Sequence, residues 1–335
     1  MKRPLISAFT LFSAIIFTAC SPTQLPEIEE EEVEVAPELS SATETPLALA
    51  TAAPLPTQPP TPNGYPQPII ETGYPEPSEP ILLTEEGYPA PTEATEQVTT
   101  LLELEVIEAF PHNTAVFTQG LVWDNGIFYE SGGNYGESAV YQVEPQTGQP
   151  ILSSPIAPEF FAEGLALVDN RLIMLTWKEG VAIEFDKNSL QEVGRFTYEG
   201  QGWGLCYEPI QNQLWMSSGS SLLVSRNPIT FEITGQVEVT DNGQAVTQIN
   251  ELECVNGLIY ANIWKSDVIV VIDSQSGAVV QKIDGSTLLT AEERAELQPG
   301  RQVLNGIAYN PQEDVFYLTG KEWPKLFKVR IVSNN

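Results

Sequence analysis

The feature that most constrains the fold of this chain is a short motif that occurs five times. Each copy starts with a polar or aromatic residue, continues with glycine or glutamate, and then has leucine or isoleucine at the start of a β-rich run. The first residues of the copies are Gln119, Glu163, Trp203, Asn250 and Asn305, so the copies start 44, 40, 47 and 55 residues apart. A period of ~40–50 residues indicates that one supersecondary unit is repeated along the chain.

Further β-rich runs follow each copy, and Asn-Gly, Asp-Asn and Thr-Gly turns separate them. We expect third strands at 139–143, 181–185, 222–225, 268–272 and 326–331. The last repeat ends before a fourth strand, so the strand at 102–110 should complete it and close a ring. Four strands per period are typical of a β-propeller. The sequence therefore predicts an all-β fold, a five-bladed β-propeller over 101–335, with one short helix near 291–297.

The first twenty residues have a different character. Lys2 and Arg3 precede an apolar stretch over 5–17, and Thr18-Ala19-Cys20 follows. This pattern predicts a signal peptide over 1–19, too short for a comfortable membrane span. The cysteine after small residues resembles a bacterial lipobox, which implies a lipid anchor on Cys20; the alternative is ordinary cleavage beside an unmodified cysteine. We expect a protein that is exported and lipid-anchored at the outer face of a bacterial membrane.

The segment from 20 to 100 has the composition of a linker. Residues 21–100 contain sixteen prolines, fifteen glutamates and no lysine or arginine, and such a segment cannot bury enough apolar surface to offset its ordering entropy. We therefore expect a disordered linker over 20–100. Residues 101–335 keep a formal charge of −17, from 13 Lys and Arg against 30 Asp and Glu. Both parts would repel phosphate groups, so we expect no nucleic-acid partner. We also expect a monomer.

The repeat also predicts which side chains meet. The innermost strands of a propeller line its axis, so the first residues of the five repeats should face one another at one mouth of the channel. Trp177 and Trp264 each lie fourteen residues after the first residue of their repeats, and Lys321 takes the same place if its turn is two residues longer. Each of these residues could instead serve packing, a turn or the surface. Their joint occurrence favours a binding site, with Asn305 the weakest member because Asn-Gly also forms turns.

The residue types limit the chemistry of such a site. His112 is the only histidine, so a histidine-based metal cluster cannot form within one chain. His112 also precedes the first inner strand, which places it poorly for a Ser-His-Asp or Cys-His arrangement. What remains is acid/base chemistry by Glu163 in an aromatic pocket, with amide and ammonium groups for developing charge. From the ordinary pKa of glutamate we expect Glu163 to be ionised across most of the range from pH ~6 to ~8.

Several motifs together resemble the plant and bacterial glutaminyl cyclases of the papaya-latex type. They are Phe117-Thr-Gln-Gly-Leu, Phe161-Ala-Glu-Gly-Leu, Gly202-Trp-Gly-Leu, Asn250-Glu-Leu-Glu, Ala261-Asn-Ile-Trp, Leu304-Asn-Gly-Ile-Ala and Thr319-Gly-Lys-Glu-Trp-Pro-Lys-Leu-Phe. The resemblance runs in order from about 110 to 331. It implies a five-bladed propeller that converts the N-terminal glutamine of peptides or proteins into pyroglutamate and releases ammonia.

The resemblance also implies roles for individual residues. Glu163 would be the acid/base residue, and Gln119, Asn250 and Lys321 are candidates for stabilising the oxyanion, with their division of labour open. The substrate-binding positions that match the family are Phe117, Phe161, Trp177, Trp203 and Trp264. The chain departs from the family at His112-Asn113, where His-Asp is common, and at Ala162, where glycine is common.

The sequence also bears on the metal requirement, on the state of the cysteines and on an alternative function. No cofactor or metal is required for catalysis; structural calcium in the channel is suggested by the resemblance only, and the sequence has no calcium-binding loop. Cys206 and Cys254 both fall on predicted inner strands, where we expect buried free thiols rather than a disulfide.

The alternative function is a non-catalytic, surface-displayed propeller that binds peptides or sugars in the same aromatic mouth, whereas a propeller lactonase would need a metal and a different acidic ring.

Overall fold

The computed structural model describes residues 99–333, so the predicted signal peptide, Cys20 and nearly all of the predicted linker lie outside the described residues. The described part contains 22 strands and one short helix, which confirms the all-β prediction. Within residues 99–333, no helix is long and apolar enough to span a membrane.

Three antiparallel sheets of four strands are formed by consecutive segments of the chain. The first contains β2 (Thr118–Asp124), β3 (Ile127–Gly132), β4 (Ala139–Glu144) and β5 (Gln149–Pro155). The second contains β6 (Ala162–Val168), β7 (Arg171–Thr176), β8 (Val181–Asp186) and β9 (Glu192–Thr197). The third contains β10 (Leu205–Glu208), β11 (Gln213–Met216), β12 (Leu222–Arg226) and β13 (Ile233–Glu238). Each sheet starts with a copy of the repeated motif, and each third strand lies where the sequence predicted it.

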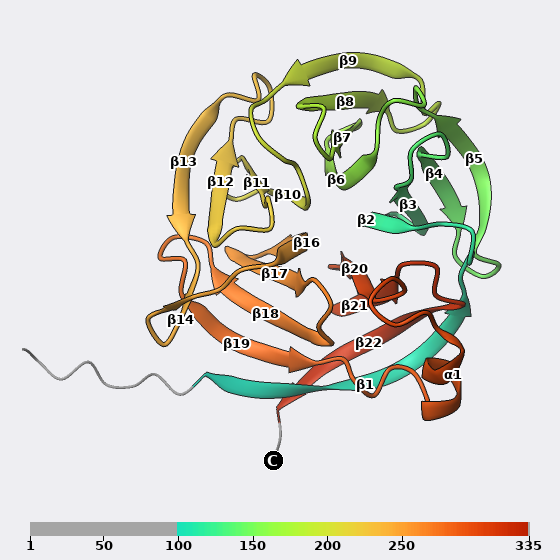
Figure 1. Cartoon of the computed structure of the whole chain (residues 1–335), viewed down its shortest axis with the longest axis vertical. Helices are drawn as coiled ribbons and strands as arrows, with labels where there is room; N and C mark the ends of the chain where they lie inside the picture. Colours follow the sequence, from blue (N-terminus) through green and yellow to red (C-terminus); the bar gives the residue numbers. More distant parts are fainter. Residues whose placement is uncertain (1–98, 334–335) are drawn as a thin grey trace, which may run out of the picture. The chain divides into compact units, whose positions relative to one another are not determined.

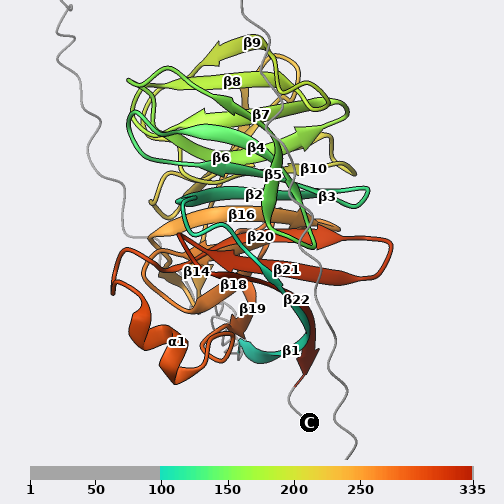
Figure 2. The ribbon, with the colours of Figure 1, turned by 90° about the vertical axis from the view of Figure 1, so that its right-hand side faces the viewer.

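The remaining strands form one sheet of eight strands and a small ribbon. In spatial order the large sheet contains β16 (Ile249–Val255), β17 (Leu258–Ile263), β18 (Val268–Asp273), β19 (Val279–Asp284), β1 (Thr100–Pro111), β22 (Lys325–Ser333), β21 (Val315–Gly320) and β20 (Leu304–Asn310). The ribbon pairs β14 (Thr240–Asp241) with β15 (Gln244–Ala245). The helix α1 (Ala291–Glu296) lies in the connection to β20, as predicted, and at the outer edge in both ribbon views (Figure 1, Figure 2).

Strand β1 joins the two ends of the described chain. It pairs antiparallel with β22 over most of its length, which confirms that this strand completes the last repeat. It also pairs in parallel with β19, from Thr100 opposite Gln281 to Leu102 opposite Ile283. The sequence did not predict this second pairing, which fuses the sheets of the last two repeats into one.

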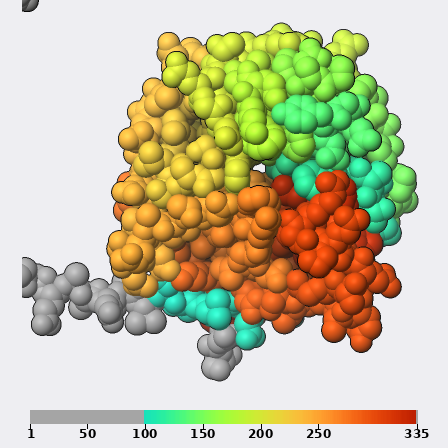
Figure 3. Space-filling model, in the orientation of Figure 1, coloured from blue at the N-terminus to red at the C-terminus, as the bar shows by residue number. Residues whose placement is uncertain are grey.

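The five strands that begin with the repeated motif lie closest to a common centre (Figure 1). Each contacts the next in the order β2, β6, β10, β16 and β20, and β20 contacts β2 again, so the contacts form a closed circle. The space-filling view shows a small opening where these strands meet (Figure 3). Equivalent residues of the repeats are thereby brought to one axis.

The second residue of the motif explains how closely the inner strands approach. It is glycine in four copies, and a Cβ on Gly164 would lie 2.5 Å from the backbone nitrogen of Leu205, which is too close for any side chain. The fourth copy has Glu251 instead. Its buried carboxyl accepts hydrogen bonds from the backbone N–H groups of Leu121 at 3.3 Å and Ile307 at 2.9 Å, so it ties β16 to β2 and β20.

Apolar packing between neighbouring sheets forms the core. Ile173 of β7 packs with Leu205 and Leu214 of the next sheet, and Trp215 packs in turn with Leu252 of β16. Outer strands such as β9 and β13 bury little of their length, as expected for strands with one solvated face.

The two cysteines of the inner strands form a disulfide, so the expectation of free thiols was wrong. Cys206 lies on β10 and Cys254 on β16, with a Cα–Cα distance of 5.4 Å, within the range that a disulfide needs. Both were correctly placed on inner strands, but their pairing depends on the relative register of two sheets. The bond therefore joins two adjacent inner strands covalently.

Candidate active site

A cavity of about 190 Å³ lies at the end of the inner strands where the repeated motifs begin. It is lined by Phe117, Gln119, Phe161, Glu163, Trp177, Trp203, Asn250, Trp264 and Lys321. The structure therefore brings together all nine residues that the sequence placed in one pocket. A second cavity of about 280 Å³, near the other ends of the inner strands, contains none of them; its lining includes Trp123, Tyr207 and Glu253.

The backbone explains why Lys321 stands where two other repeats have tryptophan. The N–H of Trp177 donates to the carbonyl of Phe161, that of Trp264 to Gln248, and that of Lys321 to Val303, at 2.8–2.9 Å. In each case the acceptor lies two residues before the first residue of the same repeat. The predicted equivalence of these three positions is therefore confirmed.

The aromatic rings pack edge to face around the cavity. The ring centroids of Phe117 and Phe161 are 6.4 Å apart, and those of Phe161 and Trp177 are 5.7 Å apart. Across the cavity, Trp203 and Trp264 are also 5.7 Å apart, at an interplanar angle of 82°. Such contacts hold large rings in fixed orientations. The walls of the cavity are consequently mostly apolar, with rings in mutually favourable orientations.

Two residues that the sequence analysis missed support these rings. The side-chain oxygen of Gln201 accepts hydrogen bonds from the indole nitrogens of Trp177 at 3.0 Å and Trp203 at 3.1 Å. Tyr135, half exposed, packs against Phe161 with a centroid distance of 5.3 Å. Neither residue occupies a repeated position, so the alignment of repeats contained no signal for them.

The polar side chains of the cavity are held by hydrogen bonds of defined direction. The ammonium of Lys321 donates to Oε1 of Gln119 at 2.5 Å. Nδ2 of Asn250 donates to Oδ1 of Asn305 at 2.8 Å, and Nδ2 of Asn305 donates to the backbone carbonyl of Thr118 at 2.9 Å. Asn305 is fully buried and does not line the cavity. It supports Asn250 from behind, which the repeat alone could not reveal.

Burial dominates the electrostatics of the site. It raises the pKa of Glu163 well above its ordinary value, an effect that the nearby Lys321 ammonium opposes. Burial likewise lowers the pKa of Lys321 to about 8, against the attraction of the Glu163 carboxylate. The expectation for the ionisation of Glu163 assumed the ordinary pKa of a solvated carboxyl, whereas burial favours the protonated form of this one.

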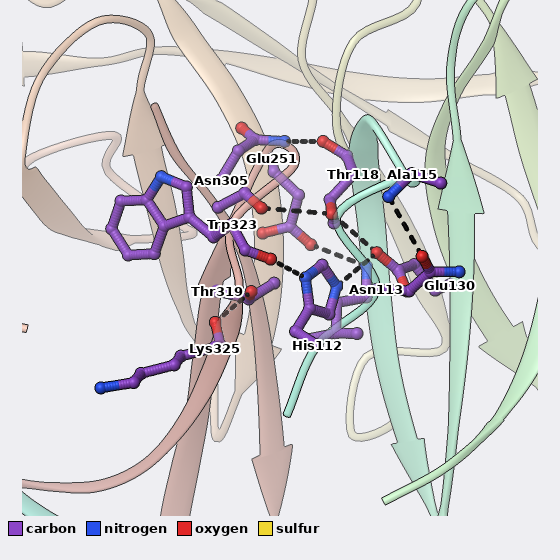
Figure 4. Close-up of polar contacts among 12 residues, drawn as sticks. His112, Asn113, Ala115, Thr118, Glu130, Glu251, Asn305, Thr319, Trp323 and Lys325 are labelled. Atoms are coloured by element: carbon purple, nitrogen blue, oxygen red, sulfur yellow. Dashed lines mark hydrogen bonds and ion pairs between the residues drawn. The ribbon is translucent and has the colours of Figure 1, made fainter. Parts of the chain in front are cut away.

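His112 lies outside the cavity, and its buried ring is held by two hydrogen-bond partners. Its Nδ1 donates to the carbonyl of Trp323 at 2.7 Å, and its Nε2 contacts Oε1 of Glu130 at 3.0 Å (Figure 4). The hydroxyl of Thr118 donates to the same Glu130 oxygen at 2.7 Å. Burial alone would lower the pKa of His112, but Glu130 and the Trp323 carbonyl outweigh it and raise the pKa. Through the Trp323 carbonyl, His112 thus links the segment that carries Gln119 to the segment that carries Lys321.

A calcium ion in the channel would need a set of oxygen ligands. Across the part of the chain that the structure describes, no three His, Cys, Asp or Glu side chains are grouped so that they could hold a metal ion. The buried carboxyl of Glu251 is instead occupied by backbone N–H groups. The described residues thus provide no carboxylate cluster for calcium.

Comparisons with known proteins agree with this geometry. A model of the glutamine cyclotransferase family matches residues 81–331. Glutaminyl-peptide cyclotransferase of Arabidopsis thaliana is 35% identical over 234 residues, which cover 68% of this chain and 71% of the relative. The crystal structure of Myxococcus xanthus glutaminyl cyclase matches with a TM-score of 0.66 and 39% identity, covering 71% of this chain and all of that one.

Proposed function

Because this chain belongs to the glutamine cyclotransferase family, we propose that its aromatic cavity is the active site of a glutaminyl-peptide cyclotransferase. The enzyme converts the N-terminal glutamine of a peptide into pyroglutamate. The α-amine forms a bond to the side-chain amide carbon, the bond from that carbon to the amide nitrogen breaks, and ammonia leaves. The observation that carries this conclusion is Glu163, the one carboxyl among the cavity-lining residues, buried close to the Lys321 ammonium.

Glu163 would move the proton. As the amine attacks, the carboxylate takes a proton from it and then delivers that proton to the departing nitrogen. Burial raises the pKa of Glu163 above that of an ordinary carboxyl, which makes the group a stronger base for the proton of the amine. The rings of Trp177, Trp203 and Trp264 would hold the glutamine folded, because proximity of amine and amide supplies much of the rate.

The direction of the hydrogen bonds suggests which polar groups stabilise the oxyanion and which one binds the substrate amine. Oε1 of Gln119 is engaged by Lys321, which leaves its Nε2 group to donate. Together with the remaining N–H bonds of Lys321, it would stabilise the oxyanion that forms on the amide carbonyl. Asn250 is oriented the other way, because its Nδ2 is held by Asn305 and its Oδ1 lies on the opposite side of the carboxamide. We assign Asn250 to accept a hydrogen bond from the substrate amine.

A comparison of three peptides tests the reaction. Ammonia release is measured with the whole protein and matched peptides that start with Gln, with N-acetyl-Gln and with Asn. Only the Gln peptide should react, because the acetylated amine is no nucleophile and Asn would have to close a four-membered ring. Equal release from the Gln and acetyl-Gln peptides would show a hydrolytic amidase and would overturn the cyclase mechanism.

The architecture that fits these observations is a five-bladed propeller over 101–335. In its support, five inner strands contact one another in a closed circle, and β1 completes the last repeat by pairing with β22. Under this proposal the eight-stranded sheet represents two blades that the short parallel pairing of β1 with β19 joins. No step of the proposed mechanism depends on the number of blades.

We also propose, from the sequence, how the enzyme is held in place. Residues 1–19 would direct export, Cys20 would carry the lipid anchor, and the proline-rich segment to residue 100 would serve as a tether. As a monomer on a long tether, the enzyme would reach free peptide N-termini at the outer face of the membrane.

A further inference from the structure

The cations around the cavity differ from the other cations of the described chain. Residues 99–333 contain 13 Lys and Arg, and nine of them have a carboxylate oxygen within 4.0 Å. The four without such a partner in this part of the chain are Lys178, Arg226, Lys265 and Lys321. Arg226 is buried against Tyr198 and Phe231. The other three stand at the active site, although acidic groups outnumber basic ones by 30 to 13.

Lys178 and Lys265 occupy equivalent positions at the mouth of the cavity. Each directly follows a cavity tryptophan and is exposed to solvent. The ammonium of Lys178 lies 3.5 Å from a ring centroid of Trp177, and that of Lys265 lies 4.2 Å from a ring centroid of Trp264. A cation–π contact of this kind places each charge beside the indole without neutralising it.

The other charges at the mouth already have partners. Arg301 lies over Phe117 but forms an ion pair with Glu322. Glu179 accepts hydrogen bonds from the hydroxyl of Tyr135 at 2.9 Å and from the backbone N–H of Lys178 at 3.3 Å. Glu179 keeps its negative charge, because both of its partners are neutral groups. The two lysine ammonium groups are therefore the exposed cations at the mouth that remain available to an anionic ligand.

We propose that Lys178 and Lys265 form a subsite for carboxylate side chains at the second and third positions of the substrate peptide. This inference rests on the proposed function, which places the N-terminal glutamine in the cavity. An extended chain advances ~3.3–3.6 Å per residue, so the next two residues pass over the mouth where the lysines stand. The net negative charge of the protein repels anions at long range, whereas the two lysines would attract a carboxylate at the mouth.

The test compares matched peptides that differ only in charge. The kcat/KM of the whole protein is measured for Gln-Asp-Asp, Gln-Ala-Ala and Gln-Lys-Lys peptides with the same neutral tail. The acidic peptide should exceed the neutral one by roughly threefold to tenfold, through a lower KM, as expected for two partly exposed ion pairs. Added salt should reduce this ratio, because it screens exposed charges.

Two double variants identify the residues responsible. Lys178→Gln with Lys265→Gln should bring the ratio of acidic to neutral peptide down to about one. Lys187→Gln with Lys328→Gln removes the same charge at lysines that pair with Asp124 and Glu313 and lie outside the cavity, and it should keep the wild-type ratio. An unchanged ratio in the first variant, or a wild-type preference for the Gln-Lys-Lys peptide, would overturn the subsite. Ammonia release from Gln-Ala-Ala tests the proposed function separately.

Discussion

At the scale of single residues, the repeat placed one group from each of five segments near a common axis, yet the five groups do different things. Gln119, Glu163, Trp203 and Asn250 line the cavity, whereas Asn305 lies behind it. The difference follows from hydrogen bonding. Nδ2 of Asn305 donates to the carbonyl of Thr118, and its Oδ1 accepts from Asn250, so both ends of the carboxamide have protein partners. Residues at equivalent positions are thus divided between lining the cavity and orienting the residues that line it.

Replacing Glu163 by glutamine tests the proton transfer. Glu163→Gln keeps the shape of the side chain but removes the group that accepts and returns the proton, so turnover should fall at least ~10²-fold. Affinity for a desamino-Gln peptide, which cannot react, should change little. A variant with wild-type turnover would exclude Glu163 as the proton carrier, and retained binding without turnover separates the enzyme from a peptide-binding or sugar-binding module.

The pH dependence of kcat/KM should have two limbs. At low pH both the substrate amine, with an ordinary pKa near ~8, and Glu163, whose pKa burial raises, are protonated, so the rate rises with pH. Above the pKa of Lys321, about 8, its ammonium loses the proton that stabilises the oxyanion, so the rate falls. In Lys321→Arg the guanidinium stays charged, and the alkaline fall should disappear. An alkaline limb that persists in this variant would place its origin elsewhere.

Asn305 should act on the amine end of the substrate only. Asn305→Ala frees the Asn250 carboxamide to turn, and kcat/KM for a Gln peptide should fall about tenfold, the scale of one buried hydrogen bond. The inhibition constant of a desamino-Gln peptide, which lacks the amine, should stay unchanged. A parallel loss of affinity for that inhibitor would mean that Asn250 contacts the amide instead, or that the variant has disturbed the whole cavity.

At the scale of elements, the site depends on contacts that hold together segments far apart in the sequence. Gln119 follows the segment that carries His112, and Lys321 follows β21, so the two residues come from opposite ends of the described chain. His112 connects these ends, because its Nδ1 donates to the carbonyl of Trp323 while its Nε2 contacts Glu130, which also accepts from the Thr118 hydroxyl. The disulfide between Cys206 and Cys254 joins β10 to β16, the two inner strands that follow Trp203 and contain Asn250.

The His112–Glu130 pair should matter for stability. His112→Ala leaves the buried carboxyl of Glu130 without its ring partner, which should lower the free energy of unfolding by ~3–5 kcal/mol. Because the folded pKa of His112 lies above its ordinary 6.5, the pair contributes fully below pH ~6.5 and loses its contribution as the pH rises through the folded pKa.

Urea unfolding of the wild type and His112→Ala at several pH values measures this effect. The double variant His112→Ala with Glu130→Gln should regain part of the lost stability, because no charge is then buried without a partner. Arg330→Ala, which breaks an exposed pair with Glu105, serves as the control and should change the midpoint little. A pH-independent difference between wild type and His112→Ala would contradict the assigned charge of His112.

At the scale of the whole molecule, the described part is a ring of sheets that its own ends close. Strand β1 precedes every repeat and yet pairs with β22, so the segment that leads from the linker is part of the closure. Its first residues also pair with β19, which adds a further contact at the point where the tether would begin. Truncations within residues 100–111 should therefore damage the fold, whereas the chain before residue 99 is proposed to act only as a tether.

Removal of the proposed lipid anchor tests whether the chain before residue 99 acts only as a tether. Cys20→Ala should move the protein from the membrane fraction to the soluble exported fraction, because the acceptor of the lipid is lost. The kcat/KM for a Gln peptide should stay at the wild-type value, since Cys20 precedes the catalytic part by the length of the linker. Cell fractionation and an ammonia assay measure the two quantities. A variant that remains in the membrane fraction would show that something other than Cys20 retains the protein.

The sequence by itself determined the four-strand repeat, the position of each third strand and, from the repeat, seven of the nine residues that line the cavity; Phe117 and Phe161 came from the family resemblance. It could do so because a recurring strand pattern maps equivalent positions onto one axis, as Trp177, Trp264 and Lys321 illustrate. Only the tertiary structure decided that Cys206 pairs with Cys254, that Gln201 and Asn305 orient the lining residues, that burial raises the pKa of Glu163, and that Lys178 and Lys265 have no carboxylate partner. These properties depend on distances between side chains of different repeats and on how much water reaches them, and neither quantity is encoded in the linear spacing of residues.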